Sequence, residues 1–168
     1  MAITTIAGHV ARALDFFERQ DIYIGIGKPD AWQDEDLPPA PTIADTALQT
    51  LIGVKRTEAQ YMVVPDPNGT IAYRDSRWRV VPADQALQEG ARWVYIEAYL
   101  RYDELPLSDY RQVGVFSRLK PKKDVPPGKY ALLPTEIESV GLLEVLDNRK
   151  KTSRNLDQKE KLSLVIEL

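Results

Sequence analysis

Apolar residues near the start of the chain recur every three or four positions, with polar residues between them. A stripe of this kind lies on one face of a helix, because an α-helix has 3.6 residues per turn. The chain is therefore predicted to begin with an amphipathic helix that ends near Gln20. Its apolar positions are Ile3, Ile6, Val10, Leu14 and Phe17.

A short apolar strand follows and leads into a segment of different character. Ile22–Ile26 is rich in β-branched residues, which predicts a buried strand. The chain then becomes acidic and proline-rich, so Trp32–Pro41 is expected to lie across the surface as an ordered loop. Trp32 is the only aromatic residue in that segment, and we expect it to anchor the loop.

The next segment carries the signals of a second short helix. Thr42 and Asp45 have the spacing of a capping box, in which each side chain bonds to the other residue's backbone N–H. Apolar residues then recur at helical spacing as far as Ile52, and Gly53 is suited to end the helix. A helix is therefore predicted over residues 43–52.

From residue 54 onward the apolar period becomes two, which is typical of β-strands. The clearest case is Trp93–Tyr102, with an aliphatic face for the core and an aromatic face for a second layer or a partner. Pro82 and Gly90 bound a small predicted helix over Ala83–Glu89. The other predicted strands are Tyr61–Val64, Ile71–Tyr73, Trp78–Val81, Tyr110–Leu119, Leu142–Asp147 and Leu162–Leu168.

Two of these strand pairs are expected to form hairpins. Tyr61–Val64 and Ile71–Tyr73 flank a turn-rich insert, so they are read as a hairpin or a long β-loop, with Asn68-Gly69 suited to positive φ. Leu142–Asp147 and Leu162–Leu168 flank a polar excursion and are read as a final hairpin. The pattern predicts a β-rich α+β fold with an N-terminal amphipathic helix and short helices in the connections.

Composition narrows the class of protein. A chain of 168 residues with 43% hydrophobic residues can build one core, so residues 1–168 are expected to form a single domain. The net charge of −3 and the absence of a long basic run argue against a nucleic-acid partner. No apolar run has the length of a membrane span, and there is no cysteine for thiol chemistry or metal binding.

The sequence contains no complete set of residues for a familiar catalytic mechanism. His9 is the only histidine, so a nucleophile–base pair or a histidine metal site lacks its second member. Gly25-Ile26-Gly27-Lys28 differs from a phosphate-binding loop in its spacing, and close packing is the simpler reason for its glycines. No catalytic residue, cofactor or metal is therefore predicted, although whether the acidic loop binds a cation stays open.

Three segments together resemble a known family. They are YIGIGKPDAWQDEDLPPAP at 23–41, YRQVGVF at 110–116 and LDNRKKTSRNLDQKEKLSLVIEL at 146–168. In this order they are similar to the baseplate wedge proteins of contractile-tailed, T4-type bacteriophages, and the likeness spans nearly the whole chain. The T4-type member is considerably longer, so this chain is expected to be a reduced-length member. The resemblance implies a layered β-sandwich with helices at its ends.

The function that the resemblance implies is structural. We expect a non-enzymatic component of the virion's tail baseplate, assembled in the host cytoplasm, that joins wedge subunits through protein–protein contacts. The expected partners are other baseplate wedge and tail proteins, tail-fibre attachment proteins among them, and further copies of the chain in a homodimer or symmetric set. Neither nucleic acid nor membrane is an expected partner. The residues expected at protein contacts are Trp32, Asp34, Glu35, Pro38, Pro39, Tyr95, Tyr99 and Arg149.

Two other functions remain open from the sequence. The first is a tail-associated carbohydrate-binding adaptor, in which Tyr95 and Tyr99 would stack on sugars. The second is a glycan-degrading enzyme that would use Asp34 or Glu35, although nothing in the loop sequence explains how one carboxyl would stay protonated beside another.

Overall fold

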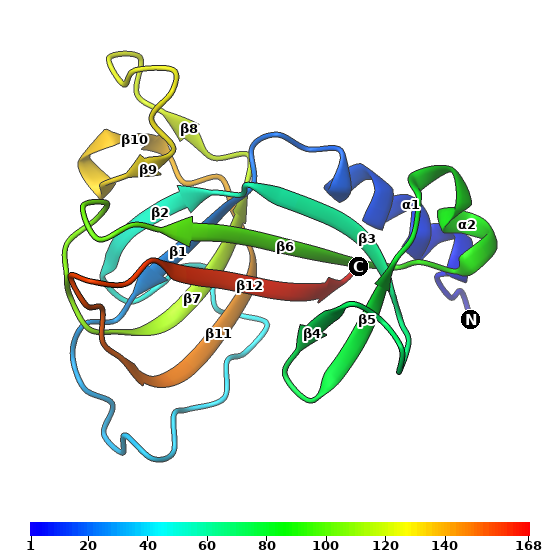
Figure 1. Cartoon of the computed structure of the whole chain (residues 1–168), viewed down its shortest axis with the longest axis horizontal. Coiled ribbons are helices and arrows are strands. Elements are labelled where there is room, and N and C mark those ends of the chain that lie inside the picture. The colour runs from blue at the N-terminus through cyan, green and yellow to red at the C-terminus, as the bar shows by residue number, and fades with distance from the viewer. The chain divides into compact units, whose positions relative to one another are not determined.

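The computed structural model describes all residues, 1–168, and they group into two compact units. Unit 1 comprises Met1–Gln20, Glu58–Glu97 and Ser163–Leu168. Unit 2 comprises Asp21–Thr57 and Ala98–Leu162. Each unit is assembled from segments that are separated in sequence (Figure 1).

Unit 2 is built on a five-stranded sheet in the order β11-β7-β1-β2-β9. Its central strand, β1, is buried at all five positions and pairs antiparallel with β2 and β7. Such a strand has no polar face, which explains its continuous apolar sequence. The strand bounds are Tyr23–Gly27 for β1, Leu51–Arg56 for β2, Tyr110–Ser117 for β7, Ala131–Leu132 for β9 and Leu142–Thr152 for β11.

Close packing on this sheet explains two of its glycines. Gly25 of β1 lies opposite Gly114 of β7, and a Cβ atom on Gly25 would come within 2.7 Å of the Phe116 ring. A Cβ atom on Gly114 would come within 2.4 Å of the Leu48 side chain. The space above these glycines is therefore filled by the core cluster, which contains Tyr23, Leu48, Val54, Phe116, Leu119, Leu132 and Ile137.

A smaller two-stranded sheet completes unit 2. Its strands are β8, Lys120–Pro121, and β10, Ile137–Ser139, and the short helix η2 spans Pro134–Glu136. Most of the lysine- and proline-rich segment that begins at β8 is exposed, as its composition predicts.

Unit 1 contains the N-terminal helix and most of a second five-stranded sheet, in the order β12-β6-β3-β5-β4. The boundary between the units falls within β6 and β12. The strand bounds are Ala59–Pro65 for β3, Ile71–Tyr73 for β4, Ser76–Val80 for β5, Trp93–Leu100 for β6 and Glu160–Glu167 for β12. The aliphatic residues of β6 are fully buried, which confirms the predicted division of that strand into two faces.

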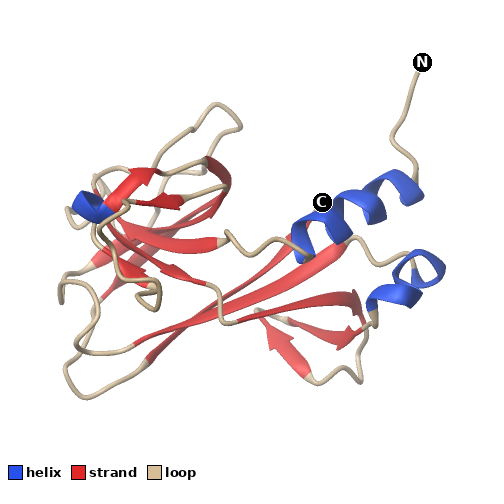
Figure 2. Ribbon diagram, turned by 90° about the horizontal axis from the view of Figure 1, so that it is seen from above, coloured by secondary structure: helices blue, strands red, loops and turns tan.

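The predicted N-terminal helix is confirmed, but it ends at Phe17 and not near Gln20. Of its five predicted apolar positions only Val10 is fully buried, whereas Ile3 lies before the helix and is 80% exposed and Ile6 is 59% exposed. The helix α1, Ile6–Phe17, starts after Thr5, whose Oγ1 accepts a hydrogen bond from the N–H of Gly8 at 3.3 Å. It packs against β3 and against α2, Ala86–Glu89, which follows the short helix η1, Ala83–Gln85 (Figure 2). Gly90 ends α2 with φ of 64°, as its position predicts.

The predicted helix over residues 43–52 is wrong. The backbone N–H of Thr42 does donate to Asp45 Oδ2 at 2.7 Å, but only a turn forms there. Leu48 is drawn into the core of unit 2, and the N–H of Gln49 donates to the side chain of Gln112 at 2.7 Å. Tertiary contacts therefore outweigh the helical pattern, and the chain enters β2 at Leu51.

Both predicted hairpins differ from the structure. The strand β3 pairs with β5 and β6, whereas β4 forms a hairpin with β5. Gly69 has no positive φ; it is required because a Cβ atom there would lie 2.2 Å from the carbonyl oxygen of Trp78. The strands β11 and β12 belong to different sheets. Alternation marks a strand but does not identify the strand beside it.

The predicted fold class is confirmed. The chain is β-rich and of the α+β class, with an N-terminal helix and short helices in the connections. None of its helices is both long enough and apolar enough to span a membrane.

Candidate protein-interaction site

Most of the residues expected at protein contacts lie in or beside one long loop of unit 2. This loop, residues 28–50, joins β1 to β2 and is called the β1–β2 loop below; Figure 1 draws it in blue to cyan. It contains Trp32, Asp34, Glu35, Pro38 and Pro39. The majority of its residues are exposed, so polar contacts with β7 and β11 hold most of it in place.

Trp32 anchors the loop on β11, as the sequence predicts. The side chain is 8% exposed, and its Nε1 donates a hydrogen bond to the carbonyl oxygen of Arg149 at 2.8 Å. The ammonium of Lys28 lies 5.2 Å from the centroid of the indole ring, in the range of a cation–π contact. Two expected contact residues, 117 positions apart, therefore meet.

A salt bridge fixes the acidic part of the loop to β7. Arg111 is 5% exposed, and its Nε donates to both carboxylate oxygens of Glu35, at 2.8 and 2.9 Å. Its Nη1 also donates to the carbonyl oxygen of Pro29. The hydrogen bonds from Arg111 hold the pKa of Glu35 below its ordinary value, and the same pairing raises the pKa of Arg111. Glu35 therefore acts as an ionised anchor.

A chain of amide groups fixes the remainder of the loop. Gln112 lies on β7 and is 2% exposed; its Oε1 accepts from the N–H of Gln49, and its Nε2 donates to Asn148 Oδ1 at 2.9 Å. Asn148 on β11 in turn donates through Nδ2 to the carbonyl oxygen of Pro39 at 2.8 Å. These bonds satisfy backbone groups that a loop would otherwise leave to water. Hydrogen bonds at Glu35 and at Gln49 therefore hold the chain on either side of Pro38 and Pro39.

Asp34 and Asp36, on either side of Glu35, face solvent. Asp34 Oδ1 accepts from the N–H of Asp36 at 2.9 Å, a local turn interaction. Asp36 and Lys150 approach within 3.5 Å, but both side chains are largely exposed, so screening leaves little energy in this pair. No group of three or more His, Asp or Glu side chains in residues 1–168 is placed to hold a metal ion.

The two tyrosines proposed for sugar stacking have different surroundings. Tyr95 in unit 1 is 2% exposed, stacks on Tyr61 with ring centroids 6.3 Å apart, and donates from its hydroxyl to Glu97 at 2.6 Å. Tyr61 is the more exposed member of that pair. Tyr99 in unit 2 is half-buried, with the ammonium of Lys159 4.1 Å from its ring centroid.

A second anchor in unit 2 holds residues 101–106. Arg154, whose side chain is 2% exposed, donates to the carbonyl oxygens of Arg101, Leu105 and Pro106 at 2.8 to 3.2 Å. Nearby, the hydroxyl of Tyr110 donates to the carboxylate of Glu160. Burial, and then the hydrogen bond and negative charge of Glu160, raise the pKa of Tyr110.

Sequence reasoning missed the roles of Arg111, Gln112 and Asn148. The available signal was the pair of polar residues, Arg111 and Gln112, next to the start of a predicted strand that is otherwise mostly apolar, since a buried polar side chain needs a partner. What the sequence did not contain was the identity of that partner, because Glu35 lies 76 positions before Arg111.

The polar contacts of this site fix the β1–β2 loop on β7 and β11. Its buried polar groups pair with the backbone and with one another, and they hold a loop whose outer side exposes Leu37 and Ile43, at 74% and 108%. Exposed apolar residues on an ordered loop are a common feature of contact surfaces between proteins.

Comparison with known proteins assigns the chain to a family. The family model described as "Baseplate wedge 3 tail fiber network component" matches residues 1–168. The chain is also 34% identical over 176 residues to "Virion protein 3" of Enterococcus phage phiEF24C, a match that covers 99% of this chain and 96% of that protein. The protein is therefore a structural component of the phage virion, located in the tail baseplate, and belongs to the baseplate wedge 3 tail fiber network component family.

Proposed function

We propose that this protein joins components of the baseplate wedge and the tail fibre network through protein–protein contacts, and that the β1–β2 loop carries a main contact surface. The observation that carries the proposal is the loop itself, which is fixed on β7 and β11 but turns Leu37 and Ile43 to solvent. An ordered surface with exposed apolar residues loses little conformational entropy when a partner binds.

The proposed partners are other baseplate and tail proteins and further copies of the same chain. The family description names a tail fibre network, and a network requires each component to bind more than one neighbour. Assemblies of this kind are built from repeated, symmetric contacts. We propose that residues 1–168 act in them as one functional domain, because both compact units are assembled from separated segments of the chain.

No catalytic step is part of the proposal. Glu35, a candidate for glycan hydrolysis, is ionised and paired with Arg111, whereas a general acid needs a raised pKa. The burial of Tyr95 also speaks against a sugar-stacking platform at that residue. Purified protein that cleaved peptidoglycan, and lost this activity in Glu35→Gln, would overturn the structural role.

The direct test is incorporation into tails. Phage lacking a functional copy would be supplied with the wild-type protein, with Leu37→Ser plus Ile43→Ser, or with a control variant, Leu87→Ser plus Leu156→Ser. The control also removes two exposed apolar side chains, but from outside the loop. Mass spectrometry of purified tails would measure the amount of the chain and of its neighbours. We expect that tails assembled with the loop variant, and not those with the control, lack this protein or one of its neighbours. The thermal stability of the purified loop variant should equal that of the wild type.

Two results would contradict the proposal. One is normal assembly and infectivity of the loop variant, which would show that the exposed loop is not a contact surface. The other is the absence of the wild-type chain from mature tails. For the symmetric copies, the test is light scattering of the purified protein, and a monomer at high concentration together with a single copy per tail would exclude them.

A further inference from the structure

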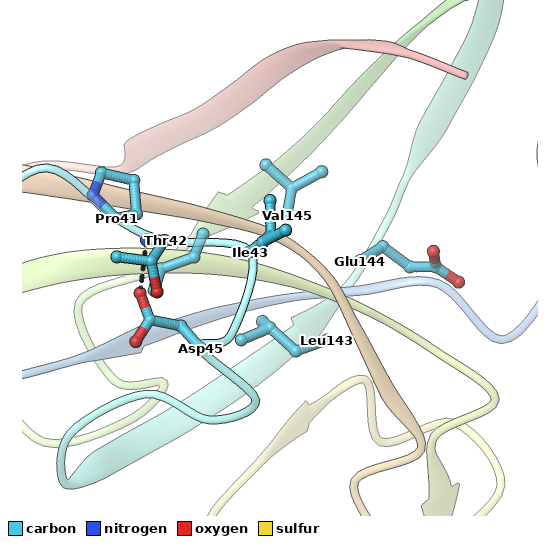
Figure 3. Close-up of a pocket in the computed structure, with 8 residues that line it drawn as sticks. Pro41, Thr42, Ile43, Asp45, Leu143, Glu144 and Val145 are labelled. Carbon is cyan, nitrogen blue, oxygen red and sulfur yellow. Dashed lines mark hydrogen bonds between the residues drawn. The ribbon is translucent and has the colours of Figure 1, made fainter.

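Beside the β1–β2 loop, unit 2 has an open groove of about 390 Å³. One wall is the loop at residues 41–45, and the other is the edge strand β11 at residues 143–146 (Figure 3). Ile43 projects from the loop wall and is 108% exposed, opposite Val145, which is half-buried on β11. The groove is therefore walled by apolar side chains that solvent reaches.

The strand wall of the groove has an open backbone edge. The strand β11 ends its sheet, so it pairs with β7 on one side only. Residues 143–146 form no backbone hydrogen bond with any segment other than β7. An unpaired edge is a template to which an extended peptide can add as a further strand.

The charges of the groove restrict what can bind there. Its charged lining residues are both acidic, Asp45 on the loop and Glu144 on β11, and no lysine or arginine lines it. Asp45 accepts from the N–H of Thr42, and Glu144 accepts from the hydroxyl of Ser117, but each carboxylate has further acceptor sites. Figure 3 shows the two acids on opposite sides of Ile43. This arrangement fits an apolar side chain flanked by basic ones.

A bulge strengthens this selectivity. The register of β11 against β7 shifts between Leu143 and Val145, so Glu144 is the extra residue. Bulges and charges on an edge strand discourage unspecific pairing. An acidic bulge repels acidic strands, adds no binding energy for neutral strands and attracts basic strands. A specific assembly needs this discrimination between partners.

We propose that this groove receives an extended segment of a neighbouring tail protein, with an apolar residue between basic residues, which adds to the open edge of β11 as a strand. The inference rests on the proposed function and specifies the chemistry of one partner. The chain's own basic segment does not fit, because its lysines enclose Pro121, which donates no backbone hydrogen bond, and because Lys120–Pro121 already pairs with β10. Arg77-Trp78-Arg79 has the right pattern but lies on β5, which already pairs with β3 and β4. The proposed occupant is therefore a segment of a different protein.

The test uses the purified full chain and a synthetic peptide of about seven alternating lysine and valine residues with capped ends, the length of a short strand. Binding would be followed by NMR, together with the hydrogen exchange of the amides of residues 143–146. We expect saturable binding and slower exchange of amides on the open edge. A peptide with glutamate in place of lysine should bind at least about tenfold more weakly, because it faces like charges.

Variants locate the binding in the groove. Ile43→Ser and Glu144→Lys should each weaken binding of the lysine–valine peptide about tenfold or more. Leu37→Ser is the matched control, since it removes an exposed apolar residue of the same loop outside the groove and should leave binding unchanged. Circular dichroism of each variant would verify that the chain remains folded.

Several results would overturn the inference. These are the absence of binding at millimolar peptide, equal binding of the glutamate peptide, or binding that leaves the exchange of residues 143–146 unchanged. Self-association that Ile43→Ser abolishes would instead identify a second copy as the occupant. If any of these results were found while the loop variant still failed to enter tails, the proposed binding of a basic strand in the groove would be refuted. The proposed function would remain supported.

Discussion

Replacement of Trp32 by alanine measures how firmly the β1–β2 loop is anchored. The side chain is 8% exposed, so the substitution removes a nearly buried indole and the hydrogen bond to Arg149. Removal of a buried tryptophan typically costs about 3–5 kcal/mol of the free energy of unfolding. For a chain of this size, that loss lowers the melting temperature by about 6–20 °C.

A second substitution separates the two contributions of Trp32. Trp32→Phe keeps most of the buried ring and removes the Nε1 donor, and a single hydrogen bond of this kind contributes about 0.5–1.5 kcal/mol. The phenylalanine variant should therefore lose much less stability than the alanine variant. If both variants lost the same amount, the hydrogen bond, and not the burial of the ring, would be the source of the anchoring.

The assay is chemical unfolding followed by circular dichroism. Tryptophan fluorescence is unsuitable as the only probe, because Trp32 is itself one of three tryptophans, and the other two, Trp78 and Trp93, lie in unit 1. Asp36→Ala is the matched control in the same loop, since that side chain is 95% exposed, and it should leave the midpoint unchanged. A loss below about 0.5 kcal/mol for Trp32→Ala would refute the reasoning, because a change of that size is typical of a surface position.

Three further predictions concern single contacts. Because Arg111 lowers the pKa of Glu35, the pair stabilises the fold above the ordinary carboxyl pKa of about 4.3, and this stabilisation is lost as the pH falls through the lower pKa of the folded state. Glu35→Gln should therefore be less stable than the wild type at neutral pH. In unfolding measured at a series of pH values, its stability should also depend less on acid. Tyr110→Phe should lose about 1.5–3 kcal/mol of unfolding free energy by the same assay, because it removes the hydrogen bond to Glu160. The folded state raises the pKa of Tyr110, so the stability of the wild type should fall above about pH 10, and the phenylalanine variant should lack this fall. Gly69→Ala should lower the free energy of unfolding by about 1–3 kcal/mol, since its Cβ atom would lie 2.2 Å from a backbone carbonyl oxygen of β5. Gly128→Ala is the control, because a Cβ atom there has no neighbour within 4 Å, and it should change the melting temperature little. Equal effects of the two substitutions would disprove the packing argument.

The structure agrees with the sequence analysis where the signal is local. The helix α1 and the two-faced strand β6 are predicted from the spacing of apolar residues, and the buried strand β1 from its β-branched residues, because these features depend on one element at a time. The position of Trp32 could also be predicted, since a large aromatic residue in a polar, proline-bounded loop has few ways to avoid water.

The helical signal at residues 43–52 shows where local reasoning fails. Thr42 and Asp45 form the expected capping contact, yet the chain does not continue as a helix. An isolated helix of about ten residues is only marginally stable in water. The burial of Leu48 and the pairing of β2 with β1 stabilise the observed conformation more than such a helix would. The competing contacts come from residues distant in sequence and leave no local pattern.

The class of this protein follows from local features of its sequence. Periodicity and composition indicated a β-rich α+β fold without complete catalytic machinery, and three separated segments indicated the baseplate wedge family. These properties are recorded residue by residue, in local spacing and in residue type.

Which segments meet depends on the three-dimensional fold. It paired Glu35 with Arg111 and Trp32 with Arg149, placed β11 and β12 in different sheets, and left the outer edge of β11 open beside the loop. A buried polar group or a strand edge needs some partner, and many segments of a chain can provide one equally well. The choice among them depends on how the whole core packs, and the contact surface of the protein follows from that choice.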